Sequence, residues 1–285
     1  MDLSTISQSL RPDATGIWRG DGEIPEGTLE FLERGHADLL RIEDDSFWFA
    51  HRNEVIALTL QRHGAKGPFL DIGGGNGVVS RRLERAGLET VLLEPGVDGA
   101  KHGKKRGLEN VACATLEAAD FLAGSFGSAG LFDVIEHVDD DASLLEGARR
   151  VLRADGVLAV TVPAYQWLWS AEDDAAGHCR RYTMGQLRKV LDGTGFVVEY
   201  TTHFFVALTL PIFLARSVPH RLGRRSVQAD LRNVEVGAAE DHVTGKGARR
   251  AIDALLAPEI HAVRAGRSLP FGSSCLAIAR VRGAR

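Results

Sequence analysis

The middle of the chain alternates short apolar runs with stretches whose apolar residues recur every three or four positions. The apolar runs cover 68–72, 90–93, 110–114, 126–131, 157–162 and 196–200. After the first run, Val79, Leu83 and Ala86 share one face of a predicted helix. Strands that alternate with helices form a mostly parallel sheet covered on both faces. The pattern therefore predicts an α/β fold with a doubly wound sheet over residues 67–200.

A glycine-rich turn follows the first predicted strand and reads Asp71-x-Gly73-x-Gly75-x-Gly77. Glycine lacks a Cβ and tolerates positive φ, so such a turn lets the backbone approach a nucleotide closely. Glu94 ends the next apolar run, 23 positions after Asp71, and a carboxylate at about this distance meets ribose hydroxyls. We therefore predict a nucleotide site here, although Glu94 could instead be an exposed carboxylate at a strand end.

Capping signals mark the later helices. Three acidic residues, 139–141, precede a helix that we expect Gly156 to end, and acidic side chains suit the positive end of a helix dipole. Thr183-x-x-Gln186 has the form of a capping box at the start of another helix. A helix signal near 251–257 and a last strand over 275–281 follow.

The flanks of this core are less regular. Residues 1–22 are polar and rich in Gly, Ser and Asp, and we expect a mobile arm. Helices are predicted over 28–40 and from Phe47 onward. We divide the chain into the arm and cap helices (1–60), a nucleotide-binding core (61–200), a lid insertion (201–270) and the last strand of the core (271–285).

Composition narrows the class of protein. The 285 residues are 44% hydrophobic and 25% charged, as in ordinary globular proteins. The net charge of −4 gives no broad basic field, so we expect no nucleic-acid partner. Three cysteines without CxxC spacing argue against disulfides and zinc and favour the reducing cytoplasm. The N-terminus lacks the regions of a signal peptide, and no apolar run reaches the roughly 18 residues that span a bilayer.

The turn and its flanking carboxylates resemble the donor site of class I methyltransferases that use S-adenosylmethionine. In the nicotinamide fingerprint G-x-G-x-x-G, by contrast, the acidic residue is not set just before the glycines. The blocks 131–138, 152–156 and 177–183 are also similar to that family, in particular to its ubiquinone-pathway O-methyltransferase-like branch. The resemblance implies a seven-stranded Rossmann-like sheet with an antiparallel last strand, a helical cap, and S-adenosylmethionine as cofactor.

The resemblance also assigns contacts to the donor. Asp71 and the glycine turn would hold its methionine and ribose end, and Glu94 would accept both ribose hydroxyls. Arg52 would bind the donor carboxylate, for which a bidentate guanidinium is suited, with a surface ion pair as the alternative. The remaining assigned residues are Leu116 and Glu117 beside the adenine, where an ordinary loop is an equal alternative, and Leu131, Phe132 and Asp133 beside the sulfonium.

Aromatic residues follow the fifth predicted strand, at the sheet edge where ligands bind in open α/β folds. Tyr165, Trp167 and Trp169 could wall an apolar pocket that excludes water from the donor, or could form a packed loop. We favour the pocket and assign these three residues to the substrate. Trp48 either packs as a cap over the fold or contacts the substrate as well.

His178 is the predicted general base, because an imidazole that titrates near neutral pH can take the proton of an attacking hydroxyl or amine. Asp173 would orient it. Arg181 and Tyr182 complete the predicted acceptor side. The alternative is structural, with His178 and Arg181 tying the loop to the sheet.

Two further patterns have competing interpretations. The block Asp133-x-x-Glu136-His137 is similar to one linked to a divalent metal in ubiquinone-pathway O-methyltransferases, but it recurs in metal-free relatives, and we predict no metal. The apolar run 204–214, followed by several arginines and a histidine, could be a lid over the substrate or an interfacial membrane element. We favour the lid and expect no membrane contact.

The sequence thus predicts methyl transfer from S-adenosylmethionine to a small molecule in secondary-metabolite or cofactor biosynthesis. Oxygen is the first choice of acceptor atom, nitrogen the second and carbon the third. One rival is a nicotinamide oxidoreductase on a similar sheet. The other is a protein that binds the donor without transferring its methyl group.

Overall fold

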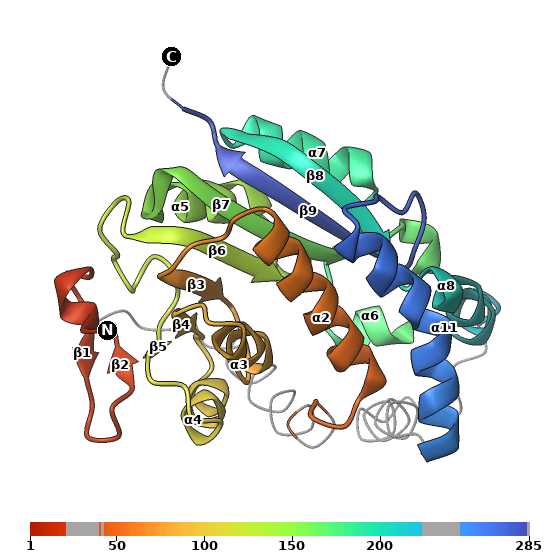
Figure 1. The fold of residues 1–285 in the computed structure, drawn as a ribbon, viewed down its shortest axis with the longest axis horizontal. Coiled ribbons are helices and arrows are strands. Elements are labelled where there is room, and N and C mark those ends of the chain that lie inside the picture. The colour runs from red at the N-terminus through yellow and green to blue at the C-terminus, as the bar shows by residue number, and fades with distance from the viewer. Residues whose placement is uncertain (21–39, 41–42, 224–245, 284–285) are drawn as a thin grey trace.

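The computed structural model describes residues 1–20, 40, 43–223 and 246–283 (Figure 1). The helix predicted over 28–40 lies outside the described residues, apart from residue 40. A nine-stranded sheet runs through the molecule in the order β1-β2-β5-β4-β3-β6-β7-β9-β8. Its strands are β1 (Arg11–Pro12), β2 (Trp18–Arg19), β3 (Phe69–Ile72), β4 (Thr90–Leu93), β5 (Val111–Cys113), β6 (Phe126–Phe132), β7 (Leu152–Pro163), β8 (Phe196–Phe204) and β9 (Ser274–Val281).

Seven strands form the predicted doubly wound sheet. β5, β4, β3, β6 and β7 are parallel, and β9 lies between β7 and β8 and is antiparallel to both. The order of the strands reverses at β3, which pairs with β4 on one side and β6 on the other. Loops at the carboxyl ends of these strands therefore leave in opposite directions and open a ligand-binding crevice.

The N-terminus belongs to the sheet, and the prediction of a mobile arm is wrong for residues 1–20. β2 pairs with β5, and β1 pairs with β2, which adds two strands to the seven expected. Leu3, Leu10 and Ile17 are buried against the core. These apolar residues are separated by polar turns and show no strand-like alternation, so only the tertiary pairing reveals them.

Helices cover both faces of the sheet (Figure 1). They are α2 (Phe47–Arg62), α3 (Val78–Arg85), α4 (Val97–Lys105), α5 (Asp141–Val151), α6 (Ala171–Ala175), α7 (Met184–Gly193), α8 (Val206–Ile212), α9 (Val218–Arg221) and α11 (Lys246–Arg264). α2, α3 and α11 contribute to one apolar core, and α5 and α7 pack into the core on the other face. The alternation of strands and helices thus produces the predicted α/β fold.

Two helix ends test the capping signals. Asp140 caps α5 by accepting the N–H of Ser143 at 2.9 Å, and Thr183 caps α7 in a capping box with Gln186. α5 ends at Val151, however, rather than at Gly156. Leu152 already has an extended backbone and pairs with Phe126, so β7 begins before the predicted strand.

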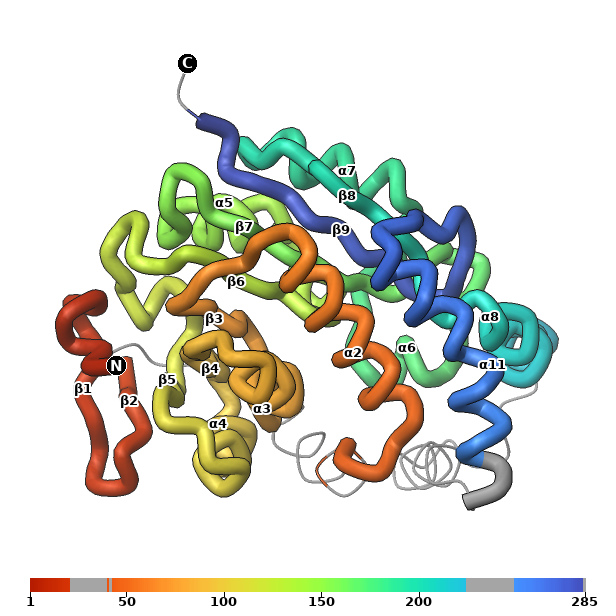
Figure 2. The backbone as a smooth tube through the Cα atoms, in the orientation of Figure 1, coloured from red at the N-terminus to blue at the C-terminus, as the bar shows by residue number. Residues whose placement is uncertain are grey.

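After β8 the chain leaves the sheet and returns to it as β9 (Figure 2). α8 continues through a π-helical turn (Phe213–Ser217) into α9, and α11 then packs beside α2 before the chain enters β9. Among the described residues, no helix has the length and apolar character required to cross a membrane.

Candidate functional site

The glycine turn between β3 and α3 has the conformation that its sequence requires. Gly73, Gly75 and Gly77 have positive φ of 67°, 56° and 76°. At Gly74, an added Cβ would lie 2.5 Å from a methyl group of Leu92 and 2.6 Å from the carboxylate of Asp71. The backbone therefore turns closely over the end of β3, with no room for side chains.

Asp71 at this strand end is fully buried. Its Oδ2 accepts the hydroxyl of Ser80 on α3 at 2.7 Å, whereas Oδ1 accepts no hydrogen bond from any described residue. Burial raises the pKa of Asp71 to about 6, although the Ser80 bond and the charge of Arg52 oppose this. The carboxylate thus has an unsatisfied oxygen beside the turn, which a donor ligand could satisfy.

Glu94 at the end of β4 faces the same turn. One oxygen accepts the N–H of Gly75 at 2.8 Å, and the other accepts the N–H of Gly96 at 2.6 Å. The side chain is 2% exposed, so Glu94 is not the exposed strand-end carboxylate of the alternative interpretation. Since a carboxylate has about four acceptor positions, both oxygens can still accept a further hydrogen bond.

Arg52 on α2 meets the end of β6. Its Nε lies 2.6 Å from Oδ2 of Asp133, and its Nη2 donates to the carbonyl of Phe132 at 2.8 Å. Asp133 has a positive φ of 57° and also accepts the hydroxyl of Thr161. The predicted arginine is therefore not a surface ion pair. It is buried with Asp133 beside the sheet edge that also holds Asp71.

The other residues assigned to the donor lie on neighbouring strand ends. Leu131 is fully buried at the end of β6, and Phe132 stacks on Phe69. Leu116 is buried after β5 and packs in the core, while Glu117 beside it is exposed. Their contacts with a donor stay predictions.

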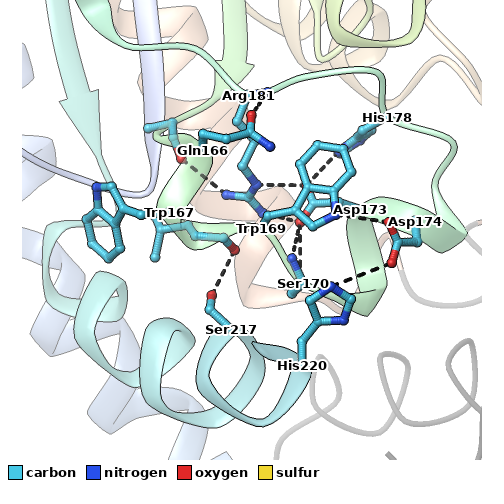
Figure 3. Close-up of polar contacts among 12 residues, drawn as sticks. Gln166, Trp167, Trp169, Ser170, Asp173, Asp174, His178, Arg181, Ser217 and His220 are labelled. Atoms are coloured by element: carbon cyan, nitrogen blue, oxygen red, sulfur yellow. Dashed lines mark hydrogen bonds and ion pairs between the residues drawn. The ribbon is translucent and has the colours of Figure 1, made fainter. Parts of the chain in front are cut away.

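Asp173 on α6 is the centre of a hydrogen-bonded cluster on the acceptor side (Figure 3). Its Oδ1 accepts Nδ1–H of His178 at 2.8 Å and Nε–H of Arg181 at 2.7 Å, and its Oδ2 accepts from Arg181 and from the N–H of Ser170. Burial alone would raise the pKa of Asp173, but the bonds from His178 and Arg181 lower it to about 2. Because an ionised carboxylate can only accept, Nδ1 of His178 carries the proton and Nε2 is its basic atom.

Arg181 and Tyr182 have structural partners. Arg181 binds Asp173 through two nitrogens and donates to the carbonyl of Ala164. Tyr182 is buried, and its hydroxyl donates to Asp141 on α5 at 2.6 Å. These contacts tie the loop to the sheet, and contact of either residue with a substrate stays a prediction.

His178 also lies close to Glu136 and His137, and one ligand atom from each of the three falls within 4.8 Å of the others. Burial and the charge of Asp133 raise the pKa of Glu136 well above its ordinary value, and burial and the neighbouring His178 lower the pKa of His137 to about 4. The metal ligands implied by the sequence pattern do not fit as a set, because Asp133 is paired with Arg52. His178 occupies the place beside Glu136 and His137 instead.

The aromatic residues after β7 form a stacked cluster. Tyr165 stacks on Trp167 and Phe271 with ring centroids 5.6 Å apart in each case. Its hydroxyl bonds Nε2 of His203 at 3.1 Å, and Nδ1–H of that histidine donates to a backbone carbonyl. Tyr165 has a positive φ of 59°, a conformation that is uncommon for a bulky residue and concentrates at functional sites.

The other predicted tryptophans lie elsewhere. Trp169 donates its indole N–H to Asp174 at 2.9 Å. Trp48 on α2 stacks on Phe205 with ring centroids 3.8 Å apart. Trp48 therefore packs at the junction between α2 and the residue that precedes α8, which is the capping role considered for it.

Sequence reasoning missed several residues that support the site. Ser80 binds Asp71, and Ser170 both caps α6 and binds Asp173. Beneath the glycine turn, Asn76 donates to Glu43, which also pairs with Arg106. The position of Ser80 in the first turn of α3 was a usable signal, whereas the others depend on contacts between distant segments.

Comparison with known proteins gives three findings. A family model described as a methyltransferase domain matches residues 47–201. The ubiquinone biosynthesis O-methyltransferase of Actinobacillus pleuropneumoniae is 31% identical over 31% of this chain and 42% of its own length. A Mycolicibacterium smegmatis protein named "probable S-adenosylmethionine-dependent methyltransferase" is 25% identical over 60% of this chain and 67% of its own length. The chain spans less than half the length of the curated ubiquinone-pathway relatives it matches.

Solved structures share the fold. A SAM-dependent methyltransferase from Thermotoga maritima superposes with a TM-score of 0.54 at 15% identity, covering 89% of this chain and 99% of its own. At this identity, the likeness concerns the arrangement of strands and helices.

Proposed function

The chain belongs to the methyltransferase-domain family, and on this premise we propose that it transfers the methyl group of S-adenosylmethionine to a small-molecule acceptor. The family match confirms the resemblance noted in the sequence. The observation that carries the proposal is the meeting of three groups at one corner of the sheet: the unsatisfied oxygen of Asp71, the glycine turn, and Glu94.

Each part of this corner suits a different part of the donor. Glu94 would accept the ribose hydroxyls, and Asp71 would accept a hydrogen bond from the methionine end. Arg52 would balance the donor carboxylate while remaining paired with Asp133. When bound, S-adenosylmethionine supplies a methyl group on a sulfonium, which is already activated toward nucleophiles. The protein then has to position the acceptor and exclude water, and orientation of this kind can be worth about 7–11 kcal/mol.

The proposed base is Nε2 of His178. The acceptor atom forms a bond to the methyl carbon, the carbon–sulfur bond breaks, and the electron pair remains on sulfur as a neutral thioether. The acceptor proton passes to Nε2, and the resulting imidazolium is stabilised by Asp173, which is 2.8 Å from Nδ1. General-base assistance contributes about 10²–10⁴-fold when an acceptor must lose a proton.

We propose oxygen as the acceptor atom, ahead of nitrogen and carbon, in secondary-metabolite or cofactor biosynthesis. The ubiquinone-pathway relatives, named as O-methyltransferases, support this choice. The stacked Tyr165 and Trp167 at the end of β7 support an acceptor with an apolar body.

Calorimetry tests the donor site directly. We expect the protein to bind S-adenosylhomocysteine, and Glu94→Gln to weaken binding about tenfold or more because an ionised acceptor of two hydroxyls is lost. Glu109→Gln changes an exposed carboxylate near β5 and serves as the matched control. No binding by the wild type would reject the proposed function, and equal binding by the wild type and Glu94→Gln would reject the ribose assignment.

A second experiment addresses the base. With an acceptor found in a panel of hydroxyl compounds, His178→Ala should lower kcat by about 10²-fold or more while leaving S-adenosylhomocysteine affinity unchanged. His261→Ala on exposed α11 is the matched control. Full turnover by His178→Ala at neutral pH would show that the residue is structural. Tight donor binding without methylated product from any acceptor would favour a protein that binds the donor without transferring its methyl group.

Metal dependence has its own test. We expect turnover to be unchanged after EDTA treatment and dialysis, because His178 acts as a base through the nitrogen that a metal would occupy. Loss of turnover that Mg²⁺, Mn²⁺ or Zn²⁺ restores would instead assign Glu136, His137 and His178 to an ion.

A further inference from the structure

The helical segment 206–222 exposes apolar side chains along one face. Leu210, Leu214 and Leu222 are 63%, 56% and 66% exposed. Pro211 and Ala215 between them are also exposed. Positions 210, 211, 214, 215 and 222 recur at helical spacing, so the exposed residues form one continuous apolar stripe.

The opposite face of the same segment carries polar groups and points inward. Ser217 is buried and donates to the carbonyl of Leu168 at 2.8 Å, and His220 lies 3.8 Å from Asp174 (Figure 3). Arg216 pairs with Glu172 at 3.4 Å. An ordinary surface helix buries its apolar face and exposes its polar one. Here the polarity is reversed, so the outer stripe is the part of the helix without an apolar partner among the described residues.

Aromatic residues extend the stripe. Phe213 packs edge-on against Trp167, and Trp167 stacks on Phe271. Trp167 and Phe271 are 38% and 41% exposed. Trp and other amphipathic aromatics are favoured at the boundary between water and lipid headgroups.

The charge of this region differs from that of the whole chain. The protein has a net charge of −4, yet residues 206–229 contain no Asp or Glu and four arginines, at 216, 221, 224 and 225. Arg221 lies at the end of α9 and is exposed. Arg224 and Arg225 follow outside the described residues. A basic cluster beside an exposed apolar stripe is complementary to an anionic lipid surface.

We propose that the outer face of residues 206–222, together with the adjoining arginines, docks on the surface of an anionic lipid bilayer. The leucines enter the headgroup region while Arg221 and its neighbours contact lipid phosphates. The segment lies along the interface and does not cross the bilayer. The polar inner face keeps its contacts with the loop 166–174, so docking needs no refolding of the site. This replaces the expectation of a lid without membrane contact.

Vesicle flotation of the full chain tests the proposal. We expect binding to phosphatidylglycerol vesicles at 0.15 M salt, with at least tenfold weaker binding to phosphatidylcholine vesicles or to phosphatidylglycerol vesicles at 0.5 M salt. No binding to anionic vesicles would overturn the proposal. Equal binding to the two lipids would overturn it as well, because the arginines would then have no role.

Matched variants locate the contact. Leu210→Ser with Leu214→Ser should lower binding to phosphatidylglycerol vesicles by about a hundredfold, since each buried leucine is worth about tenfold or more. Leu122→Ser, at a 40% exposed leucine near the start of β6, is the control. Arg224→Gln with Arg225→Gln should weaken binding, whereas Arg149→Gln with Arg150→Gln on α5 should not. Equal effects of variant and control would overturn the assignment.

Folding and oligomeric state separate the remaining explanations. Each variant should keep the wild-type circular dichroism and affinity for S-adenosylhomocysteine, which distinguishes lost docking from lost folding. Light scattering should give the same mass for the wild type and Leu210→Ser with Leu214→Ser. A dimer that the two substitutions convert to a monomer would show that the stripe contacts a second copy of the chain and would overturn lipid docking.

Discussion

Asp71→Asn should make the ligand-free protein relatively more stable as pH rises. Burial raises the pKa of Asp71 from 3.8 to about 6, so the native state binds its proton more tightly than the unfolded chain. One pKa unit corresponds to about 1.4 kcal/mol, and the wild type should therefore lose about 3 kcal/mol of unfolding free energy as pH rises from 4 to 7. Asparagine has no such loss. Its oxygen can still accept from Ser80, but its amide would lack a partner where Oδ1 has none, which costs roughly 1–2 kcal/mol.

The assay is urea unfolding of both proteins from pH 4 to pH 8. The stability of Asp71→Asn minus that of the wild type should start at or below zero at pH 4 and rise by about 3 kcal/mol by pH 7.5. Asp155→Asn, at an exposed carboxylate, should give a flat difference. S-adenosylhomocysteine should stabilise the wild type more than Asp71→Asn. A difference for Asp71→Asn that is constant with pH would refute the reasoning.

Three further outcomes follow from the structure. Because hydrogen bonds lower the pKa of Asp173 to about 2, the wild type should lose about 2 kcal/mol relative to Asp173→Asn as pH falls from 4 to 2, measured by urea unfolding. Gly74→Ala, whose Cβ would meet the Asp71 carboxylate, should lower donor affinity at least about tenfold in calorimetry, whereas Gly193→Ala, with open space around it, should not. Cys179 is the exposed one of the three cysteines, so a thiol reagent should label one site per native chain.

The donor corner could be predicted from sequence because its signals are local. Alternating strands and helices determined the parallel sheet. The spacing of glycines after Asp71 reflects a turn in which positive φ and close packing exclude other residues. Glu94 was recognisable because the next parallel strand ends at the same edge of the sheet. Each of these features depends on neighbours along the chain or on the fixed geometry of one βαβ unit.

Other features depended on contacts between distant segments. The pairing of β2 with β5 turned an apparent arm into part of the sheet, and Arg52 found Asp133 rather than solvent. The partners of Asp173 were only partly foreseen, since Ser170 caps the helix that carries it. A hydrogen bond or ion pair between segments depends on distances that the order of residues does not contain.

The segment 206–222 shows this limit most directly. Its sequence revealed an apolar run beside arginines, which suited a lid as well as a membrane element. Only the packed structure decided which side faces outward, because Ser217 and His220 bind the loop after β7 and leave Leu210 and Leu214 in solvent. Helical periodicity determines which residues share a face, but the partner across the interface determines where that face points.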